Sequence, residues 1–142
     1  MKMLFLTSVS IILVSCNISD KILKETQSII SLRRTACFGS CPIYQIEIFS
    51  NGNGIYTGTR FVKNIGATKF QLSKNELDVI LSYANQIGFT NMQGEYYEPL
   101  SDLPTTYIKI YAKEIKDYIG APKELKILEE LIDQMYLQAI TD

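Results

Sequence analysis

The pattern of apolar and polar positions predicts a body of short strands. Apolar and polar residues alternate over 28–34 and more clearly over 43–49, which is typical of strands with one buried face. The turn from Asn51 to Gly54 follows, and Asn and Gly tolerate the positive φ that tight hairpin turns require. The chain then returns as a third strand over 54–62, and 68–72 can form a short fourth one.

Two later segments repeat apolar residues with helical spacing. The first begins at a capping box, Ser73 to Glu76, and stops at Gly88. The second opens after Gly120-Ala121, with Pro122 suited to its first position. The residues expected on the buried faces are Leu77, Ile80, Leu81, Ala84 and Ile87 in the first helix, and Leu125, Leu128, Leu131, Ile132 and Met135 in the second.

Between the helices the sequence predicts a polar loop over 93–103 and a strand over 105–112. A tight turn at Lys113-Glu114 leads into a further strand over 115–119. The order is therefore β-β-β-(β)-α-β-β-α. Because hairpins imply antiparallel pairing, we expect an α+β fold in which both helices pack on one face of an antiparallel sheet of about five to six strands. Four acidic residues of the second helix are expected to form a solvated stripe: Glu124, Glu129, Glu130 and Asp133.

The N-terminus has the pattern of an export signal. Lys2 precedes an apolar run over 3–14 that is too short to span a bilayer but suits a signal peptide. The run ends in Leu13-Val14-Ser15-Cys16, which resembles the lipobox of bacterial lipoproteins, whose cysteine is acylated after cleavage. The alternative is a buried N-terminal strand or helix with an incidental cysteine. We expect a signal peptide over 1–15, a tether over 16–27 and a single domain over 28–142, anchored to the membrane through lipid on Cys16.

Composition narrows the chemistry. The chain has 142 residues, a formal net charge of −1 and no basic run, which argues against nucleic acid as a partner. It has no histidine, so the commonest metal ligand and the commonest neutral-pH general base are missing. We therefore expect no metal site and no cofactor.

Cys37 and Cys41 are the other two cysteines of the chain, and they enclose three residues. In an exported protein the default interpretation is a structural disulfide. The alternative is a redox-active pair, although thioredoxin-type chemistry uses two intervening residues next to a helix, and here the flanking segments are predicted strands.

The segment from Arg34 to Tyr44, RTACFGSCPIY, resembles the signature of an uncharacterised bacterial family, domain of unknown function 6438. The segments 102–106 and 118–122 match later parts of the family pattern, and Gly88-Phe89 also fits. Ala36 stands where the family usually has proline. The resemblance implies an exported or lipid-anchored protein with no assigned activity, and it transfers no catalytic residue.

Five polar residues form a candidate binding site if the first strand and the strand over 105–112 are neighbours: Arg33, Arg34, Asp102, Thr105 and Thr106. An Arg-Asp pair beside threonine hydroxyls can bind a carboxylate or a sugar. The alternative is structural: Asp102 pins the loop before Pro104, and an arginine fixes the cysteine loop. Tyrosines at 96, 97, 107, 111 and 118 can likewise provide a surface for a glycan or a protein partner.

These observations favour a lipid-anchored protein of the bacterial envelope, facing the periplasm or the cell surface, whose domain binds a partner or has a structural role without catalysis. The alternative is an envelope enzyme. It would use Cys37 and Cys41 in thiol-disulfide exchange, or Asp102 with Glu95 or Glu98 as a carboxylate pair.

Overall fold

The computed structural model describes residues 27–99 and 102–141. The predicted signal peptide, Cys16 and all but the last residue of the predicted tether lie outside the described residues, so they remain predictions. Within the described part of the chain, no helix is both long enough and apolar enough to cross a membrane.

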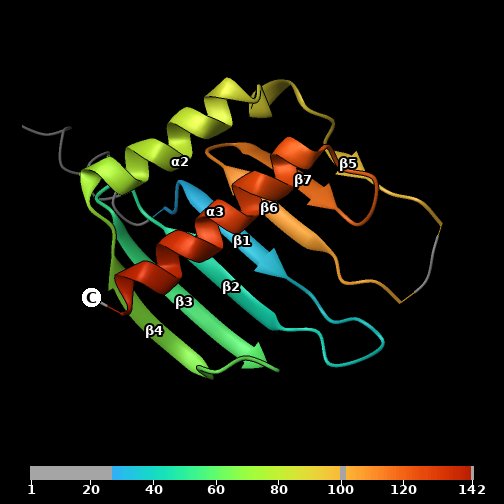
Figure 1. The fold of residues 1–142 in the computed structure, drawn as a ribbon, viewed down its shortest axis with the longest axis horizontal. Coiled ribbons are helices and arrows are strands. Elements are labelled where there is room, and N and C mark those ends of the chain that lie inside the picture. Colours follow the sequence, from blue (N-terminus) through green and yellow to red (C-terminus); the bar gives the residue numbers. More distant parts are fainter. Residues whose placement is uncertain (1–26, 100–101, 142) are drawn as a thin grey trace, which may run out of the picture.

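Seven strands form one sheet in the order β4-β3-β2-β1-β6-β7-β5 (Figure 1). All neighbouring pairs are antiparallel except β5 and β7, which are parallel. The central strand β1 pairs with β2 on one side and β6 on the other, so that Leu32 lies between Ile46 and Ile108. The strands are β1 (Ile30–Arg34), β2 (Ile43–Ile48), β3 (Asn53–Arg60), β4 (Gly66–Gln71), β5 (Glu95–Tyr96), β6 (Thr106–Ile110) and β7 (Lys113–Asp117).

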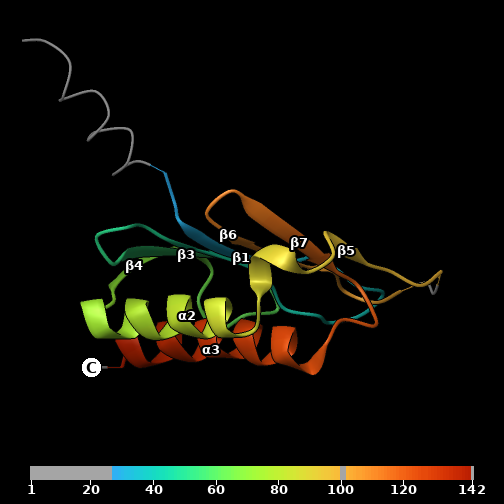
Figure 2. The same ribbon diagram turned by 90° about the horizontal axis from the view of Figure 1, so that it is seen from above.

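Two helices cover one face of this sheet and leave the other face uncovered, as Figure 2 shows. They are α2 (Lys74–Gln86) and α3 (Lys123–Ala139), and a short 3-10 helix, η1 (Phe89–Asn91), follows α2. The expected capping box is present: Ser73 Oγ accepts a hydrogen bond from the Glu76 N–H, while the Glu76 carboxylate accepts one from the Ser73 N–H. The predicted α+β class and the placement of both helices on one face are confirmed.

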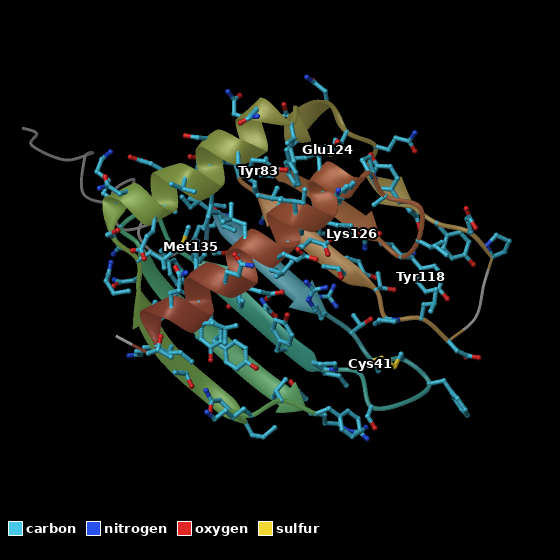
Figure 3. The ribbon with its side chains drawn as sticks, in the orientation of Figure 1. Cys41, Tyr83, Tyr118, Glu124, Lys126 and Met135 are labelled. Atoms are coloured by element: carbon cyan, nitrogen blue, oxygen red, sulfur yellow. A yellow bond between two sulfur atoms is a disulfide. The ribbon has the colours of Figure 1, made fainter. Side chains whose placement is uncertain are left out.

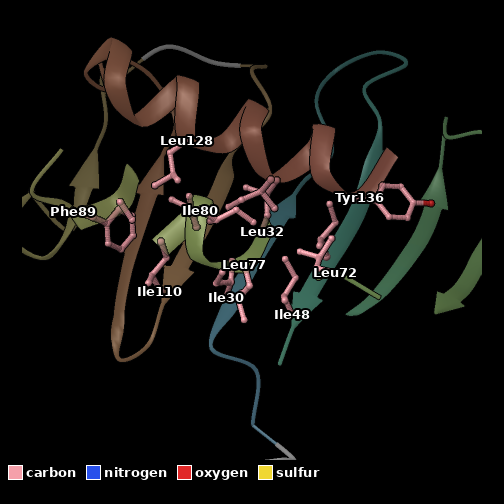
Figure 4. Close-up of a cluster of buried hydrophobic side chains, with 14 of the residues drawn as sticks. Ile30, Leu32, Ile48, Leu72, Leu77, Ile80, Phe89, Ile110, Leu128 and Tyr136 are labelled. Atoms are coloured by element: carbon pink, nitrogen blue, oxygen red, sulfur yellow. The ribbon is translucent and has the colours of Figure 1, made fainter. Parts of the chain in front are cut away.

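The hydrophobic core fills the space between the helices and the sheet (Figure 4). Alternate residues of the central strands point into it, as the alternation in the sequence predicts. Its fully buried members include Ile30, Leu32, Ile46, Ile48, Leu72, Ile80, Phe89, Ile108, Ile115, Leu125, Leu128 and Ile132.

The structure corrects several local predictions. The β6–β7 turn lies at Tyr111-Ala112, before Lys113, and Tyr111 has a positive φ of 52°. Pro122 is the N-cap of α3 rather than its first residue. The predicted polar loop contains β5, which adds a seventh strand to the five or six expected.

The predicted acidic stripe on α3 is wrong in part. Glu124 and Glu130 are exposed, but Glu129 is only 1% exposed and Asp133 is half-buried. Glu129 lies on the same helical face as Leu125 and Ile132, because residues three and four apart share a face. A carboxyl group is therefore buried between α3 and the sheet, beside the other polar side chains of this region.

Candidate functional site

Seven polar side chains meet between α3 and the sheet, and we call them the Arg34 cluster. In Figure 3, Lys126 lies on α3 above the central strands. The strands align part of the cluster, because Arg34 is the register partner of Tyr44 on β2 and of Thr106 on β6. Its members are Arg34, Tyr44, Thr106, Asp117, Lys126, Glu129 and Asp133.

Arg34 contacts four other members of the cluster. Its Nε donates to the Tyr44 hydroxyl at 2.7 Å and its Nη1 to Thr106 Oγ1 at 3.1 Å. Nη1 also lies 3.5 Å from Glu129 Oε2, and Nη2 donates to Asp133 Oδ2 at 2.8 Å. The Tyr44 hydroxyl in turn donates to Asp133 Oδ1 at 2.7 Å. All three guanidinium nitrogens thus have partners within the protein.

The same contacts determine the protonation states of Arg34 and Tyr44. Burial lowers the pKa of Arg34, but the Asp133 carboxylate, Tyr44 and Glu129 outweigh it, so the pKa lies above its ordinary value. Burial, together with the charge of Asp133, raises the pKa of the Tyr44 hydroxyl. Arg34 is therefore a cation, and Tyr44 is a neutral donor at physiological pH.

Glu129 and Asp117 form the deepest part of the cluster. Lys126 pairs with the Asp117 carboxylate and lies 4.0 Å from Glu129 Oε2. Burial raises the pKa of Glu129 to about 8; Lys126 and Arg34 oppose the shift, and the Asp117 carboxylate adds to it. Oδ1 of Asp117 and Oε1 of Glu129 are buried without a hydrogen-bond donor among the described residues. A proton on Glu129 supplies such a donor, because a protonated carboxyl group donates where a carboxylate only accepts.

The chemistry open to this cluster is limited by access. A carboxyl group with a raised pKa is a typical general acid. Glu129, however, is 1% exposed, and the Asp117 side chain is fully buried. The arrangement joins α3 to the sheet through polar contacts and offers no route for a substrate to Glu129 in this conformation.

Of the five residues of the predicted binding site, Arg34 and Thr106 meet through a hydrogen bond. Arg33 points to the uncovered face of the sheet, where its guanidinium stacks 3.9 Å from the centre of the Tyr107 ring. Thr105 pairs with Thr35: its carbonyl accepts from the Thr35 N–H at 3.0 Å, and its own N–H donates to Thr35 Oγ1 at 3.0 Å.

Asp102 joins two loops through its backbone. Its carbonyl accepts a hydrogen bond from the Phe38 N–H at 3.4 Å, and it has a positive φ of 77°. This geometry corresponds to the structural alternative, in which Asp102 pins the loop before Pro104. Of its suggested carboxylate partners, Glu95 pairs with Lys116 at 2.7 Å on the surface.

Cys37 and Cys41 are joined by a disulfide, with their Cα atoms 5.7 Å apart. The bond closes the loop between β1 and β2, and Figure 3 shows Cys41 beyond the end of β1, on the side of the molecule where Tyr118 lies. No group of three or more His, Cys, Asp or Glu side chains within residues 27–99 and 102–141 is placed to hold a metal ion.

Sequence reasoning missed the acidic half of the cluster: Asp117, Glu129 and Asp133. A signal was present for Glu129, because it stands four residues after Leu125 and three before Ile132, on the apolar stripe itself. Asp117 is the last residue of β7. No local pattern indicated that this residue faces α3, because its position depends on the register between β6 and β7.

Comparison with known proteins places most of the chain in one family. Residues 28–136 match the model of a family described as Domain of unknown function (DUF6438). A search of curated proteins finds no match. The match starts at the residue where the predicted domain starts.

Proposed function

The chain belongs to the Domain of unknown function (DUF6438) family, and we propose that it is a lipid-anchored protein of the bacterial envelope whose domain binds a partner or has a structural role without catalysis. The observation that favours this role over an enzymatic one is the Arg34 cluster. Its charged groups contact one another, and Glu129, the group with the pKa best suited to acid-base work, is buried.

The disulfide supports export. Disulfides persist outside the cytoplasm, where no thiol pool reduces them. The chain has three cysteines, and the Cys37–Cys41 bond uses two of them. Cys16 is then the remaining cysteine, in the position that a lipoprotein signal requires. This agreement between the cysteine count and the N-terminal pattern supports the anchor.

The surroundings of the disulfide favour a structural bond over thiol-disulfide exchange. A catalytic cysteine pair needs a lowered thiol pKa, which a helix N-terminus or a nearby cation usually provides. Here the bond lies in a loop between two strands, and Arg34, at the end of β1 before Cys37, is engaged by Tyr44 and Asp133. The thiol-disulfide enzyme remains the alternative that an exchange assay on the purified full-length protein tests.

Radioactive palmitate labelling tests the anchor. Cells that make the full chain should label it, and Cys16→Ala should abolish the label, because that thiol is the acylation site in our proposal. Cys37→Ser is the matched control, since it removes a cysteine that carries no lipid and should keep the label. Label that survives in Cys16→Ala contradicts the proposal.

A further inference from the structure

Phe38 is the most exposed of the large hydrophobic side chains in the part of the chain that the structure describes, with 90% of its surface accessible. Single exposed apolar residues are common and need no explanation by themselves. Phe38 differs because its backbone is fixed: it lies inside the ring closed by Cys37 and Cys41, at the tip of the β1–β2 loop.

The loop is held at several points. The Gly39 N–H donates to the Cys37 carbonyl at 2.9 Å within the ring. Outside it, the Phe38 N–H donates to Asp102, and Thr35 and Thr105 exchange hydrogen bonds at the base. A side chain on a fixed backbone loses little conformational entropy on binding, so its burial contributes more fully to affinity.

A second loop adds apolar surface beside the first. The two loops lie side by side at one end of the molecule in Figures 1 and 2. Leu103, next to Asp102, is 41% exposed, and its N–H lies 3.5 Å from the Tyr118 hydroxyl. Tyr97, 57% exposed, stacks on Tyr118 with the ring centres 5.4 Å apart. We call Phe38, Leu103 and Tyr97 the loop-tip surface.

The direction of β1 places this surface far from the point where the chain enters the domain. The described chain begins at Gln27, three residues before β1, and the disulfide loop follows the other end of that strand. Five residues of strand span about 16 Å at roughly 3.3 Å per residue. In a protein anchored through Cys16, the loop tips therefore lie at the opposite end of the sheet from the tether.

The charged residues around the loop-tip surface favour a protein partner over a lipid bilayer. The loop from Cys37 to Cys41 has no charged residue, and the described part of the second loop contributes Glu98 and Asp102. The cation beside the surface is Lys116 of β7, which lies over the Tyr97 ring at 5.3 Å and is paired with Glu95. Segments that bind anionic bilayers are instead rich in basic residues. Phe38 itself lies in an uncharged ring, and an exposed aromatic residue with uncharged neighbours is typical of the centre of a protein interface.

We propose that the loop-tip surface docks on another envelope protein, with the Phe38 ring inserting into an apolar pocket of that partner. This inference rests on the proposed function, because it assumes export and anchoring through Cys16. It names the class of partner for the binding role: a folded protein with an apolar pocket, facing the end of the domain that is remote from the tether.

Site-specific photocrosslinking tests the proposal. A benzoylphenylalanine replaces Phe38 in the full-length protein, in the cells that naturally make it, and a second strain carries the probe at Ile65. Ile65 is the control because it is 66% exposed but lies beside β4, at the other edge of the sheet. We expect one discrete protein adduct from position 38, identifiable by mass spectrometry, and none of that mass from position 65.

A second variant separates docking from folding. With the probe at Leu103, the same adduct should form and should fall at least tenfold when Phe38→Ser is added, while the melting temperature of the protein stays unchanged. Adducts only to lipid, the same adducts from positions 38 and 65, or no adduct at position 38 would overturn the proposal. Palmitate labelling of the same cells tests the anchor separately. If the protein forms the adduct but carries no palmitate label, the proposed lipid anchor is wrong and the proposed docking surface still stands.

Discussion

Arg34 on β1 and Glu129 on α3 are 95 residues apart in the chain, and their side chains meet at 3.5 Å between the sheet and the helix. Arg34 also reaches Asp133, one helical turn further along α3. A single arginine thus joins the central strand to two turns of the last helix. Because these groups are removed from water, their pairing affects stability more than a surface ion pair does.

Replacing Arg34 with methionine should destabilise the protein. Arg34→Met keeps much of the side-chain volume but leaves the Asp133 carboxylate without its cation and removes the N–H group that lies 3.5 Å from Glu129 Oε2. Removing one partner of a buried pair costs about 3–5 kcal/mol; since the Arg34 side chain is 25% exposed, we expect about 2–3 kcal/mol. The free energy of unfolding from urea titration is the measurement.

Arg33→Met is the matched control for that variant. Arg33 is the adjacent residue, but it points to the uncovered face and contacts the Tyr107 ring. An exposed cation–π contact is worth about 0.5–1 kcal/mol. Equal destabilisation by the two substitutions would show that the Arg34 cluster contributes nothing particular to stability.

Glu129 should make stability fall as the pH rises above 5. Its pKa is raised from 4.5 to about 8 on folding, so between these values the folded state holds a proton that the unfolded state has released. The contribution is complete below pH 4.5 and is lost as the pH rises to 8; a shift of this size corresponds to a total of about 5 kcal/mol, of which about 3 kcal/mol falls between pH 5.5 and 8. The chain has no histidine, so no imidazole titrates in this window. Urea titrations at pH 5.5 and 8 measure the difference.

Two substitutions identify the titrating group. Glu129→Gln keeps the shape and cannot lose the proton, so its stability should change little between the two pH values. Glu130→Gln alters the exposed neighbour and should keep the wild-type pH dependence. If Glu129→Gln loses stability with pH as steeply as the wild type, another group is responsible.

The sequence predicted those parts of the fold that local patterns determine. The α2 capping box needs only Ser73 and Glu76, and alternation over 43–49 was enough to place β2. β5 was missed because two residues, Glu95 and Tyr96, are too short for any period to be seen, and their pairing is a parallel contact with β7. Such a strand exists only through its long-range partner.

The candidate site also combines residues that local patterns predicted with residues whose position depends on long-range contacts. Arg34 and Thr106 were grouped on the condition that their strands are neighbours, and the register places them opposite each other. Arg33 was grouped with them although adjacent strand residues point to opposite faces, and its guanidinium stacks on the Tyr107 ring on the uncovered face. Glu129 was misjudged because its residue type was given more weight than its position on the apolar stripe of α3.

Gly54 should resist substitution even by alanine. It lies on β3 opposite Phe70, and a Cβ at this position would overlap the ring of Phe70. That ring is buried against Tyr136 with the ring centres 5.3 Å apart, so it has little room to move. We expect Gly54→Ala to lower the free energy of unfolding by about 1–3 kcal/mol. Gly94→Ala, where a Cβ meets no atom within 4 Å, is the control and should leave stability nearly unchanged.

Removing the disulfide should lower stability by a modest amount. The ring from Cys37 to Cys41 is small, so the entropy that it removes from the unfolded chain corresponds to about 2 kcal/mol, or roughly 5–10 °C in melting temperature. Cys37→Ser should show this loss in thermal unfolding, and the wild type measured in reductant should melt at the temperature of the variant.

The native loop has a second attachment that limits this loss. Thr35 and Thr105 bind each other at its base independently of the two cysteines: the Thr35 N–H donates to the Thr105 carbonyl at 3.0 Å, the Thr105 N–H donates to Thr35 Oγ1 at 3.0 Å, and the Thr35 hydroxyl lies 3.2 Å from the Thr105 carbonyl. Thr35→Val removes the hydroxyl that accepts from the Thr105 N–H, and it should add to the effect of Cys37→Ser by about 1 kcal/mol. A Cys37→Ser protein that melts with the oxidised wild type would show that the bond does not stabilise the fold, and the pair would then have to be tested for thiol exchange.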